Sequence, residues 1–85
     1  MKEIYQFTWL NVSTGMNNQV NILAFTESKA KECFMLNVWN KGQTELFTED
    51  QFQRTGVKVS NLNDIYTEDY LENLKQTLKI HFETT

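Results

Sequence analysis

The feature that most constrains the fold is a stretch near the start of the chain, residues 4–12, that is rich in aromatic and β-branched side chains. This composition predicts a β-strand. Alternation along a strand divides its apolar residues between two faces, with Tyr5, Phe7 and Trp9 on one and Ile4, Leu10 and Val12 on the other. Because both faces are apolar, we expect this strand to be central in a sheet or to have its second face covered.

The next apolar segment, residues 20–25, is the expected partner of this strand. The intervening residues 13–18 are rich in Ser, Thr, Gly and Asn, which favour turns. A β-hairpin is therefore predicted.

A helix is predicted to follow the hairpin and to run to Asn40. Residues 26–28 supply an N-cap candidate and an early acid, and Gly42 stands where the helix would end. Its core stripe at helical spacing consists of Ala30, Cys33, Phe34 and Val38. Residues 33–39 alone would also suit a strand, but the flanking caps favour a helix.

Residues 48–51 match the capping box, with Thr48 as the cap and Gln51 at the third helical position. Phe47 and Phe52 stand where a hydrophobic staple would form. A short helix over about 49–54, ending near Gly56, is predicted.

Alternating Val57 and Val59 predict a third strand over about 57–62. A last helix is expected from about 68 to 81, and its apolar face would hold Tyr70, Leu71, Leu74, Leu78 and Phe82. Residues 77–83 would also suit a strand, so the end of the chain is ambiguous. The predicted fold is α+β, a small antiparallel sheet packed by two helices, in the order β-β-α-(short α)-β-α.

The length of 85 residues suits one domain, residues 1–85. The net charge is −3, and the sequence contains no basic patch of the kind that nucleic-acid binders carry, so we expect no direct nucleic-acid partner. The first residues lack the apolar core of a secretion signal and no segment is long enough to span a membrane, which predicts a cytoplasmic protein. Proline is absent and Gly, Ala and Arg are scarce, a bias that suggests an AT-rich genome, such as that of a low-GC bacterium or of a phage that infects one.

The residues that usually carry chemistry are few. One thiol, Cys33, and one imidazole, His81, provide neither a nucleophile with its base nor a zinc-binding set. Residues 61–64 resemble the start of a calcium loop but lack its later ligands, and three isolated glycines form no phosphate-binding loop. We therefore expect a protein that is not an enzyme and binds no cofactor or metal.

Two features suggest a binding surface. Met35 and Trp39 form a second apolar edge on the first long helix, on the side opposite Ala30 and Phe34, and such residues are enriched in interfaces. An acidic tract would supply a surface for a basic partner; its members are Glu45, Glu49, Asp50, Asp64, Glu68, Asp69 and Glu72. Burial of the apolar edge within the fold, and simple solvation of the acids at helix starts, are the plainer interpretations.

The sequence thus favours a small protein-binding module, an inhibitor or accessory factor encoded by a phage or mobile element and acting on a host or cognate protein. Trp39 is the expected anchor, either in a homodimer or on a partner. One alternative is a small-ligand or nucleotide-binding protein with a pocket near Trp9 and Tyr5, and a weaker one is a nucleic-acid-binding protein that stacks bases on exposed rings.

Overall fold

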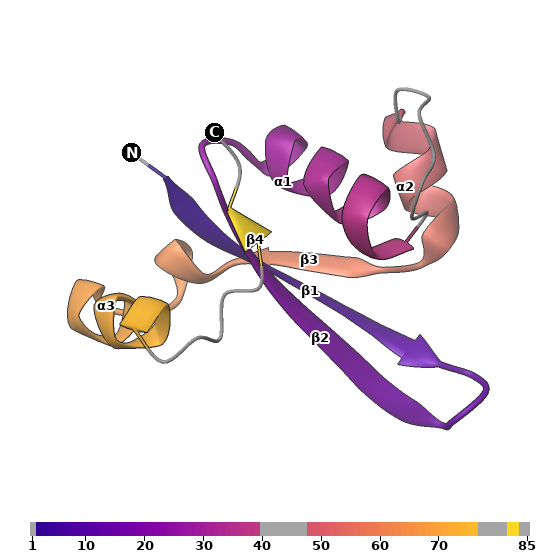
Figure 1. Ribbon diagram of the computed structural model, residues 1–85, viewed down its shortest axis with the longest axis horizontal. Helices are drawn as coiled ribbons and strands as arrows, with labels where there is room; N and C mark the ends of the chain where they lie inside the picture. Colours follow the sequence, from indigo (N-terminus) through magenta and orange to yellow (C-terminus); the bar gives the residue numbers. More distant parts are fainter. Residues whose placement is uncertain (1, 40–47, 77–81, 84–85) are drawn as a thin grey trace.

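The computed structural model describes residues 2–39, 48–76 and 82–83. Its strands are β1 (Glu3–Asn11), β2 (Met16–Ala24), β3 (Lys58–Asn61) and β4 (Phe82–Glu83). Its helices are α1 (Glu27–Phe34), α2 (Glu49–Thr55) and α3 (Glu68–Gln76), with a π-helical turn η1 (Met35–Trp39) after α1 and a 3-10 turn η2 (Leu62–Asp64) after β3. Figure 1 shows α1 and α2 together on one side of the strands and α3 apart from them. The predicted α+β fold and element order are confirmed.

The sheet has the strand order β3-β1-β2-β4. Strand β1 is antiparallel to both of its neighbours, pairing Tyr5 with Ile22 of β2 and with Asn61 of β3, so its predicted central place is confirmed. The hairpin turn is shorter than predicted, because β2 already begins at residue 16 instead of residue 20, while β1 ends at residue 11, one residue before its predicted end. Gly15 closes the turn with φ of 72°, which a residue without a Cβ atom adopts at little cost.

The larger core lies between one face of the sheet and helices α1 and α2. Phe7 of β1 stacks on Phe34 of α1 with ring centroids 4.6 Å apart, and Phe52 of α2 meets both rings edge-on at 5.9 and 6.2 Å. Ala30 and Cys33 are buried beside them, as the helical stripe predicted. This aromatic cluster anchors both helices to the sheet.

The opposite face of the sheet packs on α3. Ile4 of β1 is fully buried there with Leu62, Leu71 and Leu74. The Ile4 N–H donates to Asn63 Oδ1 at 3.0 Å and thereby ties η2 to β1. Both faces of β1 are therefore covered near its start, as its two apolar faces indicated.

The start of α2 has the predicted capping box. Thr48 Oγ1 accepts from the Gln51 N–H at 3.3 Å, and Gln51 Oε1 accepts from the Thr48 N–H at 2.8 Å. The helix ends at Gly56 in the left-handed conformation with φ of 73°. Phe47, the other half of the predicted staple, lies outside the described residues.

We expect Thr48→Ala to lower the free energy of unfolding by about 0.5–2 kcal/mol, because it leaves an N–H of the first turn without its acceptor. Thr48→Ser keeps the hydroxyl and should retain most of the stability. Chemical denaturation measures both. An unchanged midpoint for Thr48→Ala would show that the cap contributes nothing to the fold.

Lys31 joins α1 to α2. Its stem is buried, and its Nζ atom donates to Glu49 Oε1 at 2.6 Å and lies 3.3 Å from Glu27 Oε2 and 4.9 Å from the centre of the Phe52 ring. Burial lowers the pKa of Lys31, but hydrogen bonds to the two carboxylates outweigh it and the net pKa is raised. The hydrogen bond from Lys31 in turn lowers the pKa of Glu49.

Two predictions about helix ends are corrected. The helix from residue 27 loses its α geometry at Met35 and continues to Trp39 as a π-helix, and Asn40 lies outside the described residues. The helix from residue 68 is described only to Gln76, and Phe82 belongs to β4, which pairs parallel to β2, so its place on a helical face was wrong. Residues 77–81, with the predicted positions of Leu78 and His81, lie outside the described part of the chain.

Candidate functional site

The site begins with how α3 is held. Asn61 Oδ1 accepts from the Asn63 N–H at 2.9 Å and shapes the η2 turn, and Thr67 Oγ1 lies 3.4 Å from the Tyr70 nitrogen that donates to it at the start of α3. Leu71 and Leu74 are buried against Ile4. Because these two leucines hold α3 against the sheet, the opposite side of α3 faces solvent.

On that solvent-facing side of α3, Tyr70 stacks on Tyr66, which precedes the helix. The rings of Tyr66 and Tyr70 lie 4.4 Å apart between centroids at an angle of 26°, and the two residues remain 44% and 46% exposed. The neighbouring Ile65 is exposed as well. The sequence assigned Tyr70 to the apolar face of the helix, which was wrong: Leu71 and Leu74 cover the sheet, and Tyr70 packs on Tyr66 four residues earlier.

Four carboxylates surround the tyrosines along the chain. Asp64, Glu68, Asp69 and Glu72 each lie within two residues of Tyr66 or Tyr70, and all four are exposed. Over residues 62–76 a single cation, Lys75, opposes them, and its Nζ lies 3.4 Å from Glu72 Oε1. We define the acidic–aromatic surface as Asp64, Ile65, Tyr66, Glu68, Asp69, Tyr70 and Glu72.

A small hollow lies beside this surface. Its volume is about 180 Å³, and it is lined by three carboxylates, two lysines and two uncharged residues: Glu68, Asp69, Glu72, Lys2, Lys75, Asn63 and Leu71. Three of the carboxylates therefore gather around one depression. Lys2 and Lys75 offset two of these three negative charges, so the hollow keeps only a small net negative charge.

The acids of α2 are separate from this surface. Glu49 and Asp50 begin a helix that packs on the other face of the sheet, and α2 and α3 lie at opposite ends of the view in Figure 1. Glu49 is also engaged with Lys31 within the fold. The expected convergence of the whole acidic tract was therefore wrong, and Glu45, its remaining member, lies outside the described residues.

Met35 and Trp39 do not form an edge opposite Phe34. Met35 is buried in the larger core. Trp39 is 38% exposed, and its ring lies 6.0 Å from the rings of both Phe34 and Trp9. The reason is the π-helical turn: its wider repeat brings residues five apart close to the same side, whereas an α-helix would separate them.

Cys33 lies on the core side of α1, as its place in the stripe predicted. Burial raises the pKa of its thiol, which favours the unreactive protonated form. Within the described residues, no group of three or more His, Cys, Asp and Glu side chains is placed to hold a metal ion.

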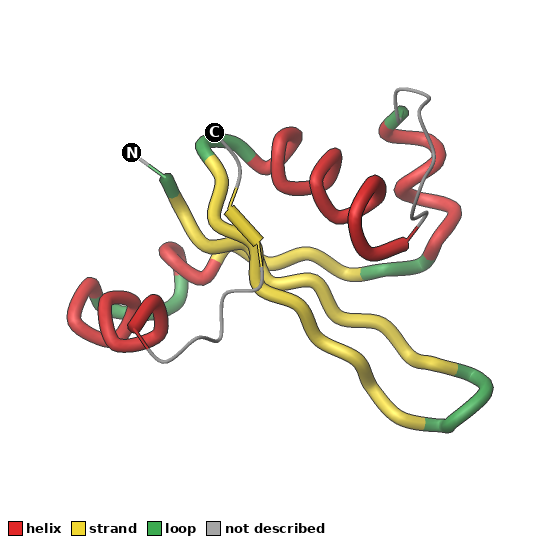
Figure 2. The backbone as a smooth tube through the Cα atoms, in the orientation of Figure 1, coloured by secondary structure: helices red, strands yellow, loops and turns green. Residues whose placement is uncertain are grey.

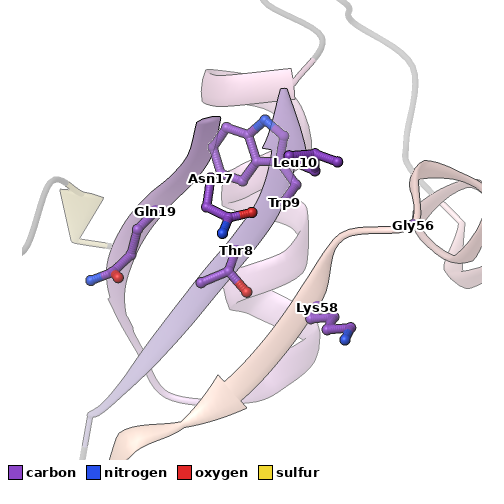
Figure 3. Close-up of a pocket in the computed structure, with 7 residues that line it drawn as sticks. All are labelled: Thr8, Trp9, Leu10, Asn17, Gln19, Gly56 and Lys58. Atoms are coloured by element: carbon purple, nitrogen blue, oxygen red, sulfur yellow. The ribbon is translucent and has the colours of Figure 1, made fainter. Parts of the chain in front are cut away.

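Another depression lies over β1, β2 and the start of β3 (Figure 3). It measures about 530 Å³ and is lined by Thr8, Trp9, Leu10, Asn17, Gln19, Gly56 and Lys58. Trp9 was predicted beside a ligand pocket, but Tyr5, its predicted companion, is buried in the core instead. The lining offers hydroxyl and amide hydrogen bonds and one cation.

Sequence reasoning identified the carboxylates of α3 but missed the tyrosines. Their spacing of four residues was a usable signal, because Leu71 and Leu74 suffice to define the buried side of the helix.

None of the helices in the described ranges is long and apolar enough to cross a membrane. Comparisons with protein-family models, curated proteins and solved structures returned no match for this chain.

Proposed function

We propose that this protein is a non-enzymatic protein-binding module that docks its acidic–aromatic surface on a basic face of a host or cognate protein. The observation that carries the proposal is the exposed Tyr66–Tyr70 stack among four carboxylates. Tyrosine rings lose few degrees of freedom on binding and bury large apolar areas, which is why they often dominate interface energetics. Stacking already restrains these two rings in the free protein, so less order must be imposed when a partner binds.

The charge around the tyrosines supports a basic partner. Asp64, Glu68, Asp69 and Glu72 give the surface a negative field that speeds encounter with a positive face. A guanidinium group suits both components, because it lies flat on an aromatic face and pairs with carboxylates. The same field repels phosphate groups, which argues against stacking of nucleic-acid bases on the tyrosines.

The composition supports a role in a phage-infected or otherwise AT-rich bacterial cell, as an inhibitor or accessory factor in the cytoplasm.

Binding of a small ligand at the depression beside Trp9 is the second candidate function. Its lining contains Lys58 as its only ionic group, which gives a charged ligand little to hold it.

Matched charge reversals test the proposal. The partner is first captured from a lysate of the source organism on immobilised wild-type protein. Asp69→Lys should then slow association with it by about tenfold or more at low salt, and the difference should shrink at high salt. Asp50→Lys is the control, because it changes the net charge equally in the first turn of another helix, on the other face of the sheet. Equal rates for the two variants would contradict the proposed surface.

A further inference from the structure

The β1–β2 hairpin extends beyond the rest of the sheet. Strand β3 pairs only with Tyr5–Thr8, and the described part of β4 pairs only with Ile22–Leu23. Figure 2 shows the closed end of the hairpin projecting away from the helices. We call residues 9–18 the hairpin arm.

The hairpin arm is built as a defined structure. Its turn is closed by the Gly15 N–H, which donates to the Asn11 carbonyl at 2.8 Å, and Asn11 Oδ1 accepts from the Ser13 N–H at 3.0 Å. Thr14 Oγ1 accepts from the Met16 N–H at 3.3 Å. These bonds fix the turn before any partner arrives.

The hairpin arm nevertheless exposes apolar side chains. Val12 is 88% exposed, and Leu10 and Met16 are exposed on the two sides of the turn. No charged residue occurs anywhere from residue 4 to residue 26. Projecting strands are normally protected against pairing by charges or proline, and this arm has neither.

The lack of charge indicates what kind of partner the hairpin arm suits, namely a second copy of this chain. In a two-fold dimer a surface meets its own copy, so any charge near the axis faces a like charge. The acidic surfaces of α2 and α3 would repel their copies, whereas the hairpin arm would not. Its polar side chains Asn11, Asn17 and Asn18 are amides, which donate and accept hydrogen bonds equally and can therefore pair with themselves.

We propose that the hairpin arm is a self-association surface that binds the hairpin arm of a second copy of this chain. A lipid surface suits it less, because residues 4–26 contain none of the lysines and arginines that accompany interfacial binding. A stable dimer buries about 800 Å² on each partner, and so small an arm provides only part of that area. The dimer is therefore weak and forms in the micromolar range.

Sedimentation equilibrium over about 5–500 µM tests the proposal, since mass action shifts a weak dimer across this range. The wild-type molar mass should rise from 10.1 kDa toward twice that value. Val12→Lys should remain monomeric at every concentration, because each copy brings a charge to the axis. Phe25→Lys is the control: it adds the same charge at an exposed apolar residue outside both the arm and the acidic–aromatic surface, and should associate as the wild type does.

Two results would overturn the proposal: a wild-type protein that stays at 10.1 kDa throughout, or a Val12→Lys variant that associates as strongly as the wild type. Circular dichroism confirms that each variant is folded, and Leu10→Lys provides a second variant of the arm. The test is separate from that of the acidic–aromatic surface, because Val12→Lys leaves α3 unchanged and should bind the basic partner normally.

Discussion

Replacing Phe34 with Ala is expected to lower the free energy of unfolding by about 3–5 kcal/mol. The Phe34 side chain is fully buried, stacks on Phe7, and meets Phe52 and Trp9 edge-on. Removal of the Phe34 ring opens a cavity where the sheet meets helices α1 and α2. Domains of this size are stable by only about 5–15 kcal/mol, so a substantial part of the stability would be lost.

Phe25→Ala is the matched control for this prediction. Phe25 is the same residue type but is 52% exposed and lies outside the aromatic cluster, with Lys2 Nζ 5.4 Å from its ring centre. Its replacement should cost less than about 1 kcal/mol. Chemical denaturation of the two variants separates them. Similar losses would show that the aromatic cluster is not the main anchor of α1 and α2.

The double replacement Tyr66→Ser with Tyr70→Ser is expected to weaken partner binding by about 2 kcal/mol or more, roughly 30-fold in Kd. Both rings are half exposed and stack on each other, so binding should lose far more than folding does. Calorimetric titration with the captured partner measures the change in affinity, and thermal unfolding measures the change in stability.

Val12→Ser provides the control for binding, because it removes an exposed apolar side chain in the hairpin arm, whose closed end lies far from α3 in Figure 1. It should bind the partner as the wild type does. If the tyrosine double variant also keeps its affinity while remaining folded, the stacked rings are not the contact.

Local signals made much of the fold predictable. The alternation in residues 4–12 fixed both the central position of β1 and its two cores, because neighbouring side chains must face opposite sides. The capping box at Thr48 and the left-handed Gly56 bounded α2, since each satisfies backbone groups within a few residues. Side-chain alternation and helix caps depend only on residues a few positions apart in the sequence.

The position of Trp39 was not predictable from periodicity. The expected face assumed the α-helical repeat through residue 39, and the π-helical turn changes that repeat. Within this turn Asn37 Nδ2 donates to the Cys33 carbonyl at 3.0 Å, a side-chain bond of the kind that competes with the regular backbone ladder. With the π-helical repeat, the Trp39 ring lies beside those of Phe34 and Trp9.

The acidic tract failed as one surface for a topological reason. Closeness in sequence suggested that Glu49 and Asp69 converge, but β3 lies between them along the chain and passes along the sheet edge. The chain enters β3 from a helix on one face and leaves it through Leu62, which packs on the other. Which face each helix takes depends on long-range packing that no local pattern encodes.

Site-specific photocrosslinking tests the central claim most directly. The photoreactive residue benzoyl-phenylalanine is placed at Tyr66 in one variant and at Asp50 in a second, and each is irradiated in a lysate of the source organism. The acidic–aromatic surface predicts an adduct with one basic protein at position 66, weakened by high salt, and none at position 50. An adduct at position 50 with none at position 66 would contradict it.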